Sequence, residues 1–78
     1  MNHLSLSIVI PVYNEQESIA IVIRNITDAL PIYFEDFEVI AVNDGSTDAT
    51  SQILAELSEE IPSLVLVNCK KNMGFGSA

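Results

Sequence analysis

Val39-Ile40-Ala41-Val42-Asn43-Asp44-Gly45-Ser46-Thr47-Asp48 is the stretch that decides the fold, because an apolar run changes abruptly into acids, a glycine and small hydroxyl residues. Near-continuous Val/Ile runs are typical of strands in parallel sheets. The run therefore predicts a buried strand that ends at Asp44. In open α/β sheets, ligands bind just beyond the carboxyl ends of such strands. Gly45 allows a tight turn there, and Asp48 is expected to act as the N-cap of a following helix.

Strand and helix patterns alternate on both sides of this stretch. Residues 4–10 and 64–68 are apolar runs of strand character, and Pro11 is expected to end the first because it has no amide to donate. The order β-α-β-α-β, with right-handed crossovers, predicts a three-stranded parallel sheet with helices packed on it. The apolar stripes that should face the sheet are Ile19, Val22, Ile23, Ile26 and Leu30 in the first helix, and Ile53, Leu54, Leu57 and Ile61 in the second.

The first helix is expected to run from about residue 15 to about residue 29. Asn14 is a favourable N-cap, and Glu17 follows it at the spacing of a capping box. Pro31 should end this helix. The second helix is expected from residue 47 or 48 to about residue 60, where Pro62 follows.

Composition limits the possible partners. The chain has 78 residues and a formal net charge of −8, from eleven acids against three Lys and Arg, which argues against nucleic acid or an anionic membrane surface. Its single cysteine, Cys69, cannot form an internal disulfide or a cysteine-rich zinc site. The first residues have no basic region before an apolar run, so neither a signal peptide nor a membrane span is expected, and a cytoplasmic or cytoplasm-facing location is inferred. The short chain is expected to be the first part of a larger protein.

Polar residues follow all three predicted strands, which should place them at one edge of the sheet and so predict a binding crevice. Tyr13 offers a stacking surface for a planar base, or is a core aromatic. Asp44 can accept an N–H of uracil or guanine, or is the acceptor of an Asx-turn. A Rossmann dinucleotide site is disfavoured because the turn after the first strand contains no glycine.

Three motifs carry a family resemblance: Ile8-Val9-Ile10-Pro11-Val12-Tyr13-Asn14-Glu15, Val42-Asn43-Asp44-Gly45-Ser46-Thr47-Asp48, and Asn72-Met73-Gly74-Phe75-Gly76-Ser77-Ala78. In this order and spacing they resemble the motifs that open the family 2 glycosyltransferases. The Tyr-Asn-Glu form and the glycine-rich ending are most similar to the branch that moves a sugar onto polyprenyl (dolichyl or undecaprenyl) phosphate. One departure is Asn43, where many members have a second Asp.

The resemblance implies a Rossmann-like GT-A fold that binds a nucleotide-diphosphate sugar, UDP- or GDP-linked. It implies backbone contacts from Pro11 and Val12 to the nucleoside, packing of Tyr13 on the base, a base or ribose contact from Glu15, a base N–H contact from Asp44, and close packing at Gly74 and Gly76.

The same resemblance implies Mg²⁺ or Mn²⁺, held by an Asp-x-Asp motif after a fourth strand. No such motif occurs in this position, and Asp36-Phe37-Glu38 precedes its strand and should lie at the wrong edge of the sheet. Metal ligands, acceptor-binding residues and any catalytic base are therefore expected outside this segment, and no catalytic residue is assigned within it.

Residues 1–78 are thus expected to be the nucleotide-binding part of an inverting sugar transferase, and the isolated segment is expected to be inactive. The acceptor expected from the resemblance is polyprenyl phosphate. A transferase acting on polysaccharide or glycan acceptors, and a non-catalytic nucleotide-binding α/β module, are the alternatives. Because missing partner strands would leave apolar sheet surface open, the isolated segment is expected to self-associate, for instance as a dimer.

Overall fold

The computed structural model describes residues 5–69. The elements follow one another as β1 (Ser5–Val12), α1 (Ile19–Ala29), the short 3-10 helix η1 (Leu30–Ile32), β2 (Asp36–Asp44), α2 (Thr50–Glu60) and β3 (Leu64–Cys69). This is the predicted β-α-β-α-β order. Neither α-helix of the described residues is long and apolar enough to cross a bilayer.

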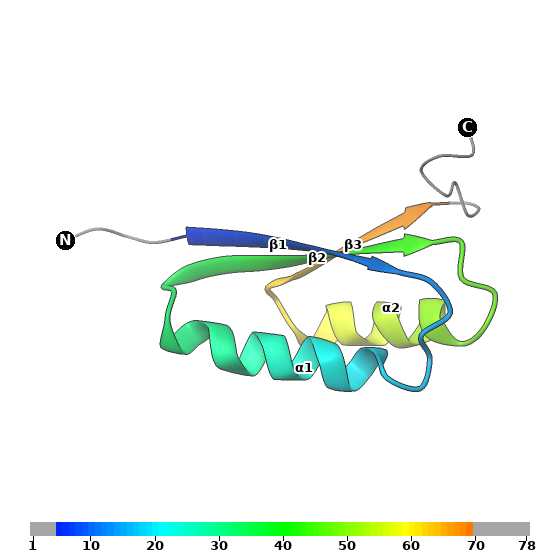
Figure 1. The fold of residues 1–78 in the computed structure, drawn as a ribbon, viewed down its shortest axis with the longest axis horizontal. Coiled ribbons are helices and arrows are strands. Elements are labelled where there is room, and N and C mark those ends of the chain that lie inside the picture. The colour runs from blue at the N-terminus through cyan, green and yellow to red at the C-terminus, as the bar shows by residue number, and fades with distance from the viewer. Residues whose placement is uncertain (1–4, 70–78) are drawn as a thin grey trace.

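The three strands form one parallel sheet in the order β1-β2-β3. Val9 lies opposite Ile40, and Ile40 lies opposite Val65. Because all strands run in the same direction, their carboxyl ends meet at one edge of the sheet (Figure 1). The prediction of a parallel α/β sheet is confirmed.

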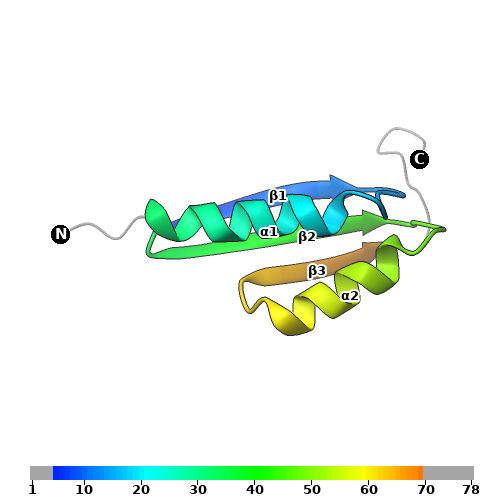
Figure 2. The same ribbon diagram turned by 90° about the horizontal axis from the view of Figure 1, so that it is seen from below.

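Both α-helices lie on the same face of the sheet, as the two views agree (Figures 1 and 2). Right-handed crossovers between strands in sequential order require this placement. The opposite face, here called the open face, carries Val9, Ile40, Val42, Val65 and Val67, and no element of residues 5–69 covers it. Val9 is 61% exposed and Val67 is 42% exposed. Within the described residues, the sheet is therefore covered on one side only.

The core lies between the sheet and the two helices. One residue of the predicted stripes is misplaced. Val22 was predicted to face the sheet, but it is 40% exposed, so this prediction is wrong. The other predicted positions are buried or packed against the core. The fully or nearly buried apolar side chains are Val12, Ile19, Ile23, Val39, Ala41, Leu54, Leu57 and Leu64.

Four predicted boundaries are wrong, and one of them is the start of β2, which lies at Asp36 and not at Val39. β1 continues through Pro11, which lies opposite Val42, to Val12. A proline is tolerated here because β1 is an edge strand of the described sheet, where a missing N–H need not break the ladder. The helices begin later than predicted, at Ile19 and at Thr50. The residues before them form hydrogen bonds between loops instead.

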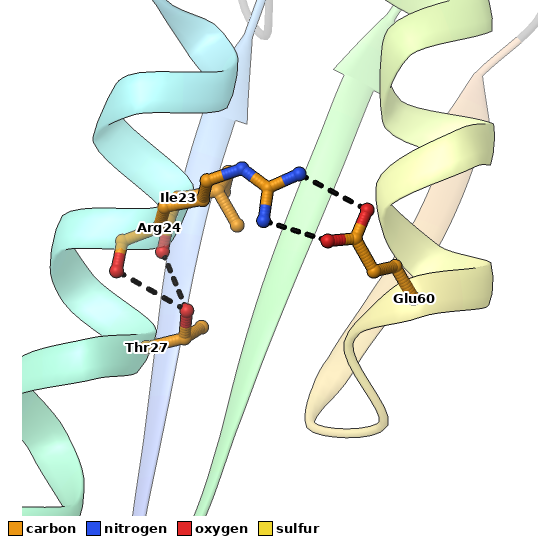
Figure 3. A network of polar contacts seen from close by, with 4 residues as sticks. All are labelled: Ile23, Arg24, Thr27 and Glu60. Carbon is orange, nitrogen blue, oxygen red and sulfur yellow. Dashed lines mark hydrogen bonds and ion pairs between the residues drawn. The ribbon is translucent and has the colours of Figure 1, made fainter.

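An ion pair joins the two helices on their outer side (Figure 3). Nη1 and Nη2 of Arg24 donate to the two carboxylate oxygens of Glu60 at 2.8 and 3.0 Å. The hydrogen bond from Arg24, together with its charge, lowers the pKa of Glu60, and the same contact raises the pKa of Arg24. Both side chains are about half exposed, so solvent screens this pair.

Candidate functional site

Two loops lie side by side at the carboxyl edge of the sheet. The first loop (residues 13–18) connects β1 to α1, and the second loop (residues 45–49) connects β2 to α2. Asp44, the last residue of β2, directly precedes the second loop. The predicted convergence of the first two strand ends is therefore present. Lys70 and Lys71, which follow the third, lie outside the described residues.

Asn14 is the main link between the loops. Its Oδ1 accepts hydrogen bonds from the backbone amides of Thr47 at 2.8 Å and of Asp48 at 3.3 Å, and its Nδ2 donates to Thr47 Oγ1 at 3.3 Å. The prediction that Asn14 caps α1 is wrong, because the side chain binds the second loop. The N-cap of α1 is Ser18, which makes no side-chain capping bond. Asn14 has a φ of 50°, a left-handed conformation that asparagine tolerates better than most residues.

Further hydrogen bonds join the loops in both directions. The amide of Asn14 donates to Ser46 Oγ at 2.9 Å, and the amide of Glu15 donates to Thr50 Oγ1 at 2.8 Å. In the reverse direction, the amide of Ala49 donates to Gln16 Oε1 at 2.9 Å. Thr50 is fully buried, so its hydroxyl has no access to bulk water and depends on such partners. These contacts and those of Asn14 are called the interloop hydrogen bonds below.

Asn43 organises the residues beneath the second loop. It is only 3% exposed, and its Nδ2 donates to Ser51 Oγ at 2.7 Å and to Asn68 Oδ1 at 3.0 Å. Its Oδ1 accepts from the amide of Ser46 at 3.3 Å, so this asparagine stabilises the turn. The Asp that many members of the resembled family have at this position could accept the same amide but could not donate to both partners.

Asp48 stabilises the start of α2. Its Oδ1 accepts the amide of Thr50, the first residue of the helix, at 2.8 Å. The predicted capping role is thus present, although the N-cap position itself is Ala49. Desolvation alone would raise the pKa of the Asp48 carboxyl, but hydrogen bonds from Thr50 and from the backbone of Gln16 outweigh it and hold that pKa below its ordinary value.

The side chains predicted to contact a nucleotide differ in accessibility. Tyr13 is 43% exposed, so the alternative of a core aromatic is wrong. Val12 is 2% exposed, and only its backbone is available to a ligand. Pro11 and Glu15 are exposed, and Asp44 is half-buried. Gly74 and Gly76 lie outside the described residues, and the predicted roles of all seven residues stay predictions.

A surface cavity of about 320 Å³ lies against the first loop. Its lining residues are Asn14, Glu15, Gln16, Glu17, Ser18 and Asp48. A second cavity of about 310 Å³ lies at the amino ends of β1 and β2, lined by residues 5–7 and 36–38. Only the first is at the edge where ligands bind in α/β sheets.

The described residues do not supply a metal site. Within residues 5–69, His, Cys, Asp and Glu side chains form no group of three or more that could hold a metal ion. Asp36 and Glu38 are at the amino end of β2, the opposite end from Asp44, and Glu38 Oε2 accepts from Ser7 Oγ at 2.6 Å. The prediction that Asp36-Phe37-Glu38 precedes its strand is wrong, because these residues are the first three of β2, whereas the prediction that they lie at the wrong edge of the sheet is confirmed.

Sequence reasoning missed most of the interloop hydrogen bonds. No role was predicted for Thr50 or Gln16, and Ser46 and Thr47 lie in the stretch predicted as a turn and helix start. Their small hydroxyl side chains indicated a turn. Nothing in the local pattern indicated partners more than thirty residues earlier.

Two curated relatives have similar sequences. An undecaprenyl-phosphate 4-deoxy-4-formamido-L-arabinose transferase of Enterobacter sp. (strain 638) is 43% identical over 74 residues, and that of Yersinia enterocolitica is 40% identical over 74 residues. In both cases the match covers 94% of this chain and 23% of the relative. The chain therefore spans about a quarter of the length of these proteins.

Solved structures share the fold. The crystal structure of S. aureus TarS 1–349 superposes with a TM-score of 0.72, and that of its complex with UDP with 0.73. Each is 29% identical, with 91% of this chain and 20% of the other chain covered. The predicted GT-A type α/β fold is confirmed.

The model of the family described as "Glycosyl transferase family 2" matches residues 7–78. This range includes all three motifs on which the resemblance was based. The chain therefore belongs to glycosyl transferase family 2.

Proposed function

We propose that this segment binds the nucleoside of a nucleotide-diphosphate sugar in an enzyme that transfers the sugar to polyprenyl phosphate. The observation that carries the proposal is the exposed ring of Tyr13 beside the carboxyl ends of β1 and β2, where Asp44 also lies, in a chain of glycosyl transferase family 2. The names of the relatives support a lipid-phosphate acceptor. The TarS complex with UDP supports the proposal that a protein of this fold binds a nucleotide.

Each proposed contact has a simple chemical basis. The Tyr13 ring stacks on the base, and the Asp44 carboxylate accepts the imide N–H of uracil or the N1–H of guanine. A base without that N–H would lack this hydrogen bond, which is how such a site discriminates. Glu15 contacts base or ribose, and the backbone of Pro11 and Val12 borders the nucleoside. Gly74 and Gly76 are proposed, on the family motif alone, to permit close packing near the nucleotide.

The proposed reaction is an inverting displacement. An oxygen of the acceptor phosphate forms a bond to the anomeric carbon while the bond from that carbon to the nucleoside diphosphate breaks. A lipid phosphate is already anionic and needs little base catalysis. We propose that Mg²⁺ or Mn²⁺ is bound by residues other than 5–69 and neutralises the diphosphate. The reaction is proposed to occur on the cytoplasmic side of a membrane, with attachment through other regions, and the segment alone is proposed to be inactive.

The central test is Asp44→Asn in the complete protein, with UDP and GDP binding measured by calorimetry. Because a hydrogen bond to a charged group contributes about 1.5–3 kcal/mol, the affinity for the preferred nucleotide should fall at least about tenfold. Asp28→Asn, an exposed change on α1, is the matched control. Equal affinity in Asp44→Asn and the unaltered protein would remove the base-recognition role. Sugar transfer from UDP- and GDP-sugars to undecaprenyl phosphate then separates an enzyme from a non-catalytic binding module.

We also propose that the isolated 78-residue segment forms a dimer through the open face. Val9, Val65 and Val67 form exposed apolar surface there, and surfaces of this kind favour association.

A further inference from the structure

We propose that Asn14 is a positioning residue, which holds Tyr13 and Glu15 in the arrangement that a nucleotide requires. The inference rests on the proposed function and deepens it, because Asn14 itself is assigned no contact with the nucleotide. Its two sequence neighbours are the proposed contacts of the first loop. Because Asn14 lies between them in the chain, fixing its backbone also fixes the positions from which the side chains of Tyr13 and Glu15 extend.

Asn14 is fixed through its backbone and its side chain together. Its amide donates to Ser46 Oγ at 2.9 Å, while its Oδ1 accepts from the amides of Thr47 at 2.8 Å and Asp48 at 3.3 Å. The next amide along the first loop, that of Glu15, donates to the buried Thr50 hydroxyl at 2.8 Å. The first loop is therefore attached at consecutive residues to the second loop and to the start of α2.

The attachment links the proposed contacts of the first loop to Asp44. Asp44 is separated from Ser46 only by Gly45, which has a φ of 72°. The second loop is itself tied to the buried Asn43 through the amide of Ser46. Tyr13 and Glu15 are thus held against the same short segment that carries the proposed base acceptor.

Two requirements at position 14 explain an asparagine. The left-handed φ of 50° excludes most residues with a Cβ atom, and glycine, asparagine and aspartate tolerate it best. The amides of Thr47 and Asp48 require a short side chain with an acceptor oxygen. Glycine meets the first requirement alone, whereas aspartate meets both.

Without the Asn14 side chain, the first loop would lose part of its attachment, and binding would have to order it. Ordering a loop on binding weakens affinity, whereas a preorganised loop avoids that cost. The expected effect is a higher Kd in molecules that are otherwise folded. A merely structural role would instead reduce the fraction of competent molecules and leave the Kd of the remainder unchanged.

The experiment is calorimetric titration of the complete protein with UDP and with GDP, in which Kd and stoichiometry are read separately. We expect Asn14→Gly to raise the Kd of the preferred nucleotide about tenfold, the scale of one lost hydrogen bond, with stoichiometry near that of the unaltered protein. Asn14→Asp, which keeps the acceptor oxygen, should restore the Kd to within about threefold. Asn25→Gly, the same change at an exposed position of α1, should leave the Kd unchanged even if it lowers the melting temperature.

A second pair tests the same arrangement if Asn14→Gly does not fold. Thr50→Val removes the hydroxyl that accepts the Glu15 amide and keeps the shape of the side chain, and Thr50→Ser keeps the hydroxyl. Thr50→Val should raise the Kd severalfold and Thr50→Ser should not.

The outcomes separate the two proposals. If the unaltered protein binds neither UDP nor GDP, the proposed function fails and the inference falls with it. If it binds, the inference alone is overturned by an unchanged Kd in Asn14→Gly and Thr50→Val, or by an Asn14→Asp variant as weak as Asn14→Gly.

Discussion

The side-chain amide of Asn43 donates a 3.0 Å hydrogen bond to Oδ1 of Asn68, which joins the carboxyl ends of β2 and β3. Both asparagines lie opposite one another in the strand register. The same amide also reaches Ser51 on α2. One buried side chain therefore ties two strands, a helix and the turn that carries the candidate site.

We predict that Asn43→Leu destabilises the complete protein. The change removes the hydrogen bonds to Ser51, to Asn68 and from the Ser46 amide, and a typical hydrogen bond of this kind contributes about 0.5–1.5 kcal/mol. A lower urea midpoint should report the loss. Asn43→Asp keeps the acceptor for Ser46 and should lose less, because the Asn68 amide can turn to donate. Equal urea midpoints for Asn43→Leu and the unaltered protein would show that the Asn43 hydrogen bonds do not stabilise the fold.

We predict an acid-dependent contribution from Asp48. Its pKa is lowered in the folded protein, so its stabilising effect is fully present above the unfolded value of about 3.9 and is lost as the pH falls through the lower folded value. Asp48→Asn should therefore lower the melting temperature at neutral pH and have a smaller effect at pH values below that range. The measurement is thermal unfolding as a function of pH. A difference between variant and unaltered protein that stays constant with pH would exclude this linkage.

The Arg24–Glu60 pair is predicted to contribute little. Glu60→Gln should lower the melting temperature only slightly, and the difference should shrink in high salt because the pair is exposed. The lowered pKa of Glu60 means that its contribution is present above the unfolded value of about 4.3 and is lost in acid. Glu59→Gln removes a charge from the same helix and is the control. A loss that persists unchanged in high salt would show a role other than charge pairing.

Tyr13 is predicted to affect binding and not stability. Stacking of a base on an aromatic side chain contributes about 1–3 kcal/mol, so Tyr13→Ala should weaken UDP or GDP binding by roughly fivefold or more. Tyr13→Phe should retain most of the affinity because the ring remains. The melting temperature should hardly change, since the side chain is exposed. If Tyr13→Ala binds as well as Tyr13→Phe, the ring has no stacking role.

The open face is predicted to drive association of the isolated segment. Val67→Lys places a charge on that face and should convert a dimer of the 78-residue chain into a monomer, as measured by light scattering across a concentration series. Ile21→Lys changes an exposed residue of α1 and is the control. A monodisperse monomer of the unaltered segment at all concentrations would contradict the prediction.

The sequence predicted what depends on local pattern. The apolar run that ends at Asp44, the stripe of α2 and the parallel direction of the strands follow from residue spacing and from the alternation of strands and helices. The family motifs added the expected nucleotide contacts. These features recur within short windows, which is why they can be recognised in one chain.

Prediction from the sequence failed where residues that are distant in the chain decide the local structure. Asn14 and Glu17 have the spacing of a capping box, yet Asn14 bonds to Thr47 and Asp48, and α1 begins only at Ile19. Pro11 was expected to end β1, but the effect of a proline depends on whether its strand is at an edge. The strand order, which puts both helices on one face, is likewise decided by tertiary packing.

The interloop hydrogen bonds also bear on how the site arises during protein synthesis. Each joins residues 32 to 35 positions apart, so all of their partners have left the ribosome once α2 has emerged. During synthesis, regions made first can fold before regions made later. The surface that we propose for the nucleotide can thus be assembled from nascent chain before the later parts of a longer polypeptide are translated.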